Sequence, residues 1–164
     1  MRIAIACDHP GVALKNKLIE LLQARGHEAV DLGTDGPASV DYPDYALRVT
    51  GEVIAGRCAC GILICGTGIG MSLSANKVPG IRAAIATNAY MARMARAHND
   101  ANVLCLGARV IGEGVAEEVL EAWLETPFEG GRHAVRVDKI RQIECQYLSL
   151  GSGADKRQES GIRD

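Results

Sequence analysis

Short apolar runs alternate with segments of helical periodicity along most of the chain, and this alternation constrains the fold more than any other feature. The run RIAIAC at 2–7 is apolar on both faces, as a strand buried in a parallel sheet must be. Five runs are predicted strands: 2–7, 28–32, 61–65, 82–86 and 103–107. The pattern predicts an α/β protein with a three-layer Rossmann-like fold, in which helices cover both faces of a five-stranded parallel sheet.

Helices are predicted between the strands and after the last of them. Leu14, Leu18 and Leu22 recur at helical spacing before a stop at Gly26. A second predicted helix carries Tyr45, Val49 and Val53 on one face, and a third, short helix ends near Lys77. The remaining predicted helices cover 88–98, 113–125 and 137–150.

The length of 164 residues favours one domain, which we place at residues 1–150. The helix at 137–150 has no strand of its own to cover. Its apolar stripe consists of Ile140, Ile143, Tyr147 and Leu148. We expect this stripe to pack on the body of the protein or on a second subunit. Residues 151–164 are polar and glycine-containing and predict a disordered C-terminal tail.

Charge and cysteine usage narrow the possible partners. The formal net charge of -2 offers no basic excess for nucleic acid or a membrane surface, and no apolar run approaches the roughly 20 residues of a spanning helix.

Three of the six cysteines, Cys7, Cys65 and Cys105, sit in or at the ends of apolar runs. With no secretory signal, this distribution indicates a reducing, cytoplasmic location. Cys58 and Cys60 have no second pair at zinc spacing, so no metal site is predicted.

Polar and glycine residues gather where the predicted strands end. These positions are 8–9, 65–70, Thr87 and 107–109. Because ligands of open parallel sheets bind at the carboxyl ends of the strands, we expect a functional site at this edge.

The glycine loop CGTGIGMS does not match the common phosphate-binding loops. Gly66, Gly68 and Gly70 follow a G-x-G-x-G spacing, unlike the dinucleotide fingerprint, and the acidic residue expected about 20 positions later is missing. A P-loop would need lysine where Met71 stands, and a cysteine phosphatase loop would need arginine at the same position.

Two kinds of chemistry remain open for this loop. Backbone N–H groups near a helix start favour an anion, and the same positive end stabilises a thiolate at Cys65. Such a thiolate can attack a carbonyl, or it can take a proton from carbon while the N–H groups hold the resulting enediolate.

Five segments occur in an order that makes the pattern specific. They are CDHPG at 7–11, DYPDYA at 41–46, ILICGTGIGMSLSANK at 62–77, AHNDANVLCLGARVIG at 97–112 and FEGGRHAVRV at 128–137. The chain closely resembles the type B ribose-5-phosphate isomerases, in a family that includes allose-6-phosphate and galactose-6-phosphate isomerases. The resemblance covers about residues 1 to 145.

The resemblance implies an aldose–ketose isomerase that interconverts ribose 5-phosphate and ribulose 5-phosphate through a cis-enediolate, without cofactor or metal. It further implies a homodimer or a dimer of dimers, with the C-terminal helix at the dimer interface and sites shared between subunits. Cys65 matches the base that moves the proton between C1 and C2. Some members use a glutamate where this chain has Met71, so the chain matches the cysteine branch.

The same resemblance assigns the other candidate site residues. Asp8 handles protons on the O1 and O2 oxygens, His98 with Thr67 opens the sugar ring, and Asn99 contacts the enediolate. The implied substrate-binding residues are His9, Arg109, Arg132 and Arg136 for the phosphate, Tyr42 for the sugar, and the backbone of Gly66, Gly68, Ile69 and Gly70 for the developing anion. Arg132 and Arg136 are four apart, so one helical turn would aim both the same way.

Three alternatives stay open. The first is isomerisation of another phosphorylated sugar, such as allose 6-phosphate or galactose 6-phosphate. Galactose-6-phosphate isomerases of this family divide the site between two different chains, whereas all the matched residues occur here in one chain, which favours the ribose type. The second is a non-catalytic nucleotide- or FMN-binding module, and the third is a cysteine hydrolase with a covalent intermediate.

Overall fold

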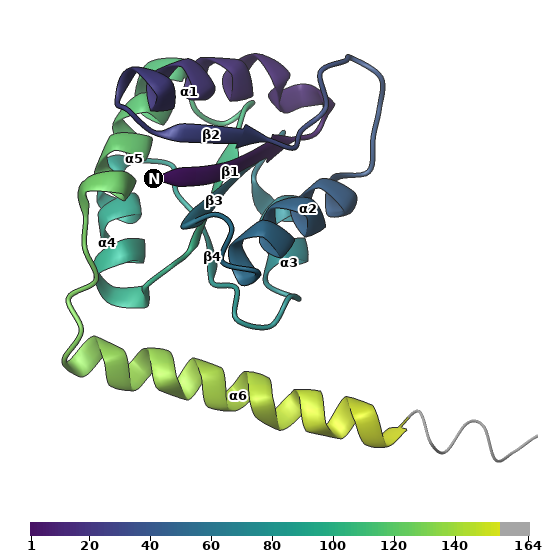
Figure 1. The fold of residues 1–164 in the computed structure, drawn as a ribbon, viewed down its shortest axis with the longest axis vertical. Coiled ribbons are helices and arrows are strands. Elements are labelled where there is room, and N and C mark those ends of the chain that lie inside the picture. The colour runs from purple at the N-terminus through teal and green to yellow at the C-terminus, as the bar shows by residue number, and fades with distance from the viewer. Residues whose placement is uncertain (155–164) are drawn as a thin grey trace, which may run out of the picture.

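The computed structural model describes residues 1–154, and it contains the predicted sheet. The strands are β1 (Arg2–Cys7), β2 (Glu28–Asp31), β3 (Cys60–Cys65), β4 (Ala83–Ile85) and β5 (Val103–Gly107). All neighbouring pairs are parallel, and the order across the sheet is β2-β1-β3-β5-β4 (Figure 1). The prediction of a five-stranded parallel sheet is therefore confirmed.

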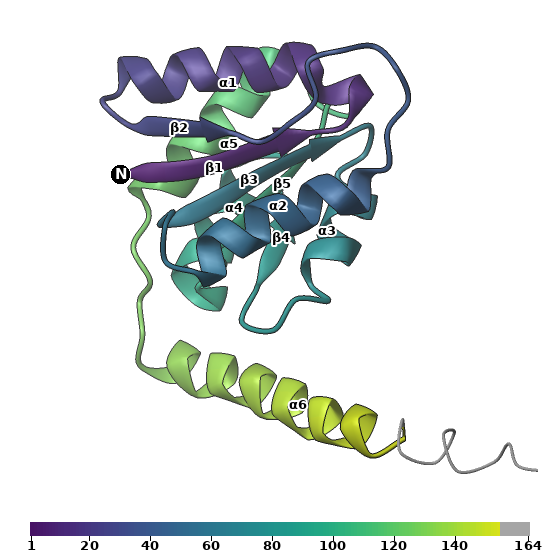
Figure 2. The same cartoon turned by 45° about the vertical axis from the view of Figure 1, so that its right-hand side comes forward.

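Helices cover both faces of the sheet, which confirms the three layers (Figures 1 and 2). The elements between and after the strands are a short 3-10 turn (His9–Gly11), α1 (Val12–Ala24), α2 (Tyr42–Ile54), α3 (Ile69–Ala75), α4 (Ala89–Asn99), α5 (Glu113–Glu125) and α6 (Arg132–Ala154). Ile3 and Ile5 pack into the core with α1, α4 and α5, whereas Ala4 and Ala6 pack into the core with α2 and α3. This alternation follows from the two-residue period of a strand, which sends successive side chains to opposite faces.

The order of the strands creates a switch point between β1 and β3. From β1 the chain crosses to β2 on one side, and from β2 it crosses over to β3 on the other side. The two crossovers leave in opposite directions, so a crevice opens between the carboxyl ends of β1 and β3. At this end the N–H of Asp8 donates to the carbonyl oxygen of Ile64 at 3.1 Å, which holds the two strand ends in register.

The last helix, α6, differs from its prediction in both bounds. It begins at Arg132, ahead of the predicted start at residue 137, and it continues through Ala154. It therefore includes the first residues of the predicted tail, and the remainder of that tail, 155–164, lies outside the described residues. Arg132 and Arg136 stand on one helix, as the four-residue spacing predicts.

Helix α6 lies outside the three layers and runs across one side of the body (Figures 1 and 2), where its first turns contact α4. The N–H of Gly80 donates to both carboxylate oxygens of Glu144 at 3.0 Å, and a groove of about 710 Å³ separates this part of α6 from β4 and the loop before it. The predicted apolar stripe is exposed: Ile140, Ile143, Tyr147 and Leu148 are 45%, 58%, 65% and 52% accessible. Within residues 1–154, no helix is long and apolar enough to cross a membrane.

Candidate active site

The predicted site residues fall into two groups in this chain. The first group, at the carboxyl ends of the strands, consists of Asp8, His9, Tyr42, Cys65, Gly66, Thr67, Gly68, Ile69, Gly70 and Arg109. The second group, at the end of α4 and the start of α6, consists of His98, Asn99, Arg132 and Arg136.

The first group is assembled by the three central strands. Asp8 follows β1, Cys65 ends β3, and Arg109 follows β5. The N–H of Arg109 donates to the carbonyl oxygen of Gly66 at 3.0 Å, and the N–H of Ala108 donates to that of Cys65 at 2.9 Å. These bonds bring the segment after β5 against the glycine loop, so a cationic side chain stands beside the acid and the thiol.

Cys65 differs from Cys7 and Cys105, which lie in the neighbouring strands β1 and β5. Burial raises the pKa of the Cys7 thiol to about 11, and burial also raises the pKa of the Cys105 thiol. Both behave as small core residues. The sulfur of Cys65, in contrast, accepts the N–H of Gly68 at 3.1 Å from the loop that follows it. This hydrogen bond orients the sulfur of Cys65 toward the glycine loop.

The glycine loop needs its small residues for two physical reasons. Gly68 has φ +79 in the left-handed region, where α3 begins, and a side chain there would strain the backbone. Space is also short. A Cβ atom on Gly107 would lie 2.7 Å from the carbonyl carbon of Thr67, and one on Gly70 would lie 2.8 Å from the ring of Tyr42. The loop, the end of β5 and Tyr42 are therefore in close contact.

Replacing Gly107 with alanine is expected to displace the glycine loop, because the new methyl group meets backbone atoms of Thr67 that cannot rotate away. We expect a loss of about 1–3 kcal/mol in the free energy of unfolding, as for other overpacked sites, together with a loss of turnover. Denaturant unfolding and steady-state kinetics would measure both. Gly114→Ala is the matched control, because nothing lies within 4 Å of its Cβ position. Equal behaviour of the two variants would contradict the steric argument.

Asp8 and His9 each carry a buried polar atom with no hydrogen-bond partner among the described residues: Oδ1 of Asp8 and Nδ1 of His9. Burial raises the pKa of the Asp8 carboxyl, and the nearby side chains of His9 and Arg109 partly oppose the rise. Since buried polar atoms in folded proteins are nearly always paired, these two atoms suit a polar ligand in the crevice. An acid with a raised pKa is also better able to give and take protons near neutral pH.

The second group lies at the opposite end of the strands from the first group. Helix α4 starts after the carboxyl end of β4 and its 11 residues run back by about 16 Å. Its end is fixed by Arg82, which precedes β4 and donates to the carbonyl oxygens of Asn99 at 3.2 Å and Asp100 at 2.8 Å. His98 and Asn99 therefore stand near the amino ends of the strands, and one copy of the chain does not bring them to Cys65.

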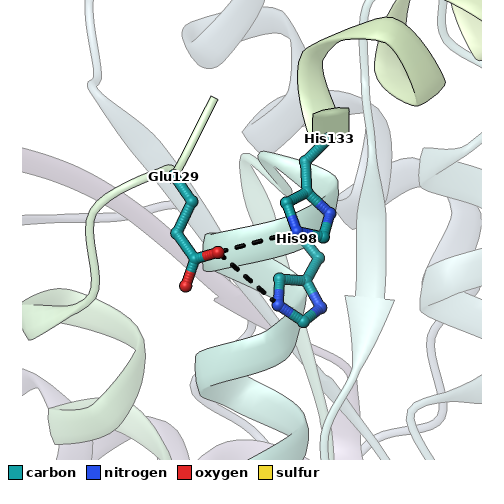
Figure 3. Close-up of side chains that lie close together, drawn as sticks. All are labelled: His98, Glu129 and His133. Atoms are coloured by element: carbon teal, nitrogen blue, oxygen red, sulfur yellow. Dashed lines mark ion pairs between the residues drawn. The ribbon is translucent and has the colours of Figure 1, made fainter. Parts of the chain in front are cut away.

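Two neighbours of His98 were not among the residues predicted from the sequence. The ring of His133 stacks on that of His98, with centroids 4.0 Å apart and planes at 3° (Figure 3). Oε2 of Glu129 lies 3.8 Å from Nε2 of His98 and 3.6 Å from Nε2 of His133. Both new residues belong to the segment FEGGRHAVRV, where His133 stands between the two predicted arginines. That position is a sequence signal that could have indicated His133.

A buried acid, a hydrogen-bonded thiol and an arginine lie together at the switch point of a parallel sheet, which is where α/β enzymes bind their ligands. The family model described as Ribose/Galactose Isomerase matches residues 3–140. The chain belongs to this family, and it is an isomerase.

The similarity of this chain to individual relatives extends over nearly the whole length of each relative. Ribose-5-phosphate isomerase B of Escherichia coli is 47% identical over 143 residues, which are 87% of this chain and 96% of the relative. D-erythrulose-4-phosphate isomerase of Pectobacterium atrosepticum is 44% identical, over 89% and 97% of the two chains. The structure of ribose-5-phosphate isomerase B from Clostridium thermocellum superposes with a TM-score of 0.88 at 55% identity, covering 90% of this chain and 99% of that one.

Proposed function

We propose that the protein interconverts ribose 5-phosphate and ribulose 5-phosphate through a cis-enediolate. The observation that carries the proposal is the thiol of Cys65, which accepts the N–H of Gly68 at 3.1 Å and stands at the same switch point as the buried Asp8. The names of the Escherichia coli and Clostridium thermocellum relatives support ribose 5-phosphate as the substrate. Incubation of the purified protein with ribose 5-phosphate and detection of the ketose would test it.

Isomerisation of another sugar phosphate is the second candidate. The Pectobacterium relative is named for a four-carbon ketose phosphate, so similar chains serve different substrates. Comparison of kcat/KM for ribose 5-phosphate, allose 6-phosphate and erythrose 4-phosphate would decide between them. A higher value for either of the other two sugars would replace ribose 5-phosphate as the proposed substrate.

The proposed reaction begins with a closed furanose, so the ring must open before a proton can leave carbon. His98 and Thr67 would carry this step, because imidazole titrates near neutral pH and can pass a proton to the ring oxygen. Cys65 would then move the proton between C2 and C1. Met71, which stands where some members have a glutamate, is buried and has no proton to exchange, so it offers no substitute base.

Charge that develops on oxygen during proton transfer needs donors nearby. Asp8 would exchange protons with O1 and O2, and backbone N–H groups of the loop from Gly66 to Gly70 would hold the enediolate, with Asn99 as a further amide. In comparable sites the loss of one such donor costs about 10²–10³ in rate. The anion-binding loop is therefore expected to contribute more than a modest change in the thiol pKa, since one pKa unit corresponds to only about 1.4 kcal/mol.

We further propose that the working site is shared between two copies of the chain. Residues of the first group lie at the carboxyl ends of the strands, and those of the second group lie near the amino ends. This separation supports a site completed by a second subunit. The start of α6 holds Arg132 and Arg136, and its exposed stripe of apolar side chains supports an interface on the same helix. The arrangement would be a homodimer or a dimer of dimers.

The free thiols support a cytoplasmic location for this reaction. All six cysteines lie in the described part of the chain and none is in a disulfide. Free, mostly buried thiols are typical of proteins kept in a reducing compartment.

Arg136→Ala is expected to raise KM for the sugar phosphate by roughly 10- to 150-fold, because a hydrogen bond to a charged group contributes about 1.5–3 kcal/mol. The KM for unphosphorylated ribose should change far less. Arg141→Ala is the matched control, since Arg141 lies on the same helix and pairs with Asp138 at 3.0 Å on an exposed face. An equal change in KM for both sugars would remove Arg136 from the phosphate site.

A further inference from the structure

We propose that His133 is a positioning residue, whose ring holds the imidazole of His98 in the orientation needed for opening the sugar ring. The inference rests on the proposed function, which gives His98 that step. It adds a residue that does not itself touch the substrate.

The contact between the two rings is tight and one of its partners is fixed. The side chain of His133 is 6% exposed, and that of His98 is 35% exposed. The N–H of His133 donates to the carbonyl oxygen of Gly130 at 2.9 Å, which anchors the first turn of α6. Figure 3 shows the two imidazoles face to face, one from α4 and one from α6. The more exposed ring of His98 therefore stacks on a buried ring whose backbone is anchored.

The charges around the pair suit a stack of this kind. Burial lowers the pKa of His133, and nearby His98, Arg132 and Arg136 lower it further, while Glu129 opposes them. The lowered pKa favours the neutral form of His133, which stacks on the neighbouring ring at 4.0 Å without adding a second positive charge beside it. The carboxylate of Glu129, 3.8 Å from Nε2 of His98, would attract the protonated form of that ring.

Metal binding is the competing reading of the same cluster, because His98, Glu129 and His133 place their ligand atoms within 4.8 Å of one another. The orientation of the rings argues against it. An imidazole lone pair lies in the plane of its ring. The two rings are stacked nearly parallel, at 3° with centroids 4.0 Å apart, so their lone pairs do not converge on one ion. Nε of Arg132 also lies 3.4 Å from Nε2 of His133, where it places a positive charge beside the atom that would bind the metal.

Two substitutions separate positioning from a general structural role. His133→Leu removes the flat ring, and we expect kcat for ribose 5-phosphate to fall by about 10- to 100-fold with little change in KM, as for other misplaced catalytic groups. His133→Phe keeps an aromatic plane and should retain kcat within about 3-fold. Melting temperatures of both variants would show whether the fold is intact. If the two variants are equally stable and lose kcat equally, the proposal is overturned. It is also overturned if His133→Leu changes only KM and leaves kcat as in the wild type.

A double-mutant cycle tests whether His133 acts through His98. In a His98→Asn background, adding His133→Leu should cause no further loss of kcat, because the group that His133 orients is already gone. If the loss of kcat in the double variant equals the product of the losses in the two single variants, the inference is contradicted.

NMR of labelled histidines gives a readout that does not depend on activity. The ring current of His133 should shift the carbon-bound ring protons of His98, and the shift should disappear in His133→Leu and persist in His133→Phe. If wild-type protein converts none of the sugar phosphates, the proposed function fails while this measurement still decides whether His133 orients His98. An unshifted His98 in the wild type would overturn the positioning role.

Discussion

Cys65→Ala is expected to lose nearly all turnover and to keep its fold. The proposed reaction needs a base at C1 and C2, and a positioned general base contributes about 10²–10⁴ in rate. Asp8 and His9 follow β1 at the same end of the sheet, and the proposed mechanism already uses them for the sugar oxygens and the phosphate. Buried Met71 cannot replace the thiol. Steady-state kinetics and circular dichroism on the same sample would measure the two effects.

A control variant shows whether the loss of activity is specific to the thiol of Cys65. Cys145 is exposed on α6, so Cys145→Ala should behave as wild type. Wild-type activity in Cys65→Ala would defeat the assignment of the base. A covalent intermediate trapped on Cys65 with an acyl or phosphoryl substrate would instead support the hydrolase alternative.

The second large effect is recovery of activity from two inactive proteins. Cys65→Ala damages the first group of site residues, and His98→Asn damages the second. If sites are shared, a mixed dimer pairs the intact first group of one chain with the intact second group of the other. Random reassembly of a one-to-one mixture makes half of the dimers mixed, each with one complete site, so about one quarter of wild-type activity should return.

The measurement is the turnover of the mixture after the subunits have been exchanged, with each variant alone as the reference. A mixture of Cys65→Ala with Asp8→Asn serves as the control, because both substitutions fall in the same group and no intact pair can form. Equal recovery in both mixtures, or recovery in neither, would count against a site divided between copies.

The sequence predicts those parts of the fold that are governed by burial within one chain. The bounds of β1 and α5 match the prediction, since apolar residues define both elements. The first group of site residues could also be placed from sequence, because Asp8 and Cys65 end strands that a parallel sheet brings to one edge.

Features that depend on contacts distant in the sequence were missed. The start of α6 was placed too late because Arg132–Arg136 contains no apolar stripe, and the left-handed residues Gly130 and Gly131 that precede the helix leave no periodic signal. The pairing of His98 with His133 joins the end of α4 to α6. No local pattern predicts which ring lies on which, so the cluster became visible only in three dimensions.

The placement of α6 outside the three layers, with its apolar stripe exposed, has a consequence for how activity would vary with the amount of protein. Under the proposed arrangement, a chain on its own has an intact sheet but only half of a catalytic centre. Specific activity would then fall on dilution below the dissociation constant of the dimer and would recover on concentration, by mass action. A newly made chain would stay inert until it met a second copy.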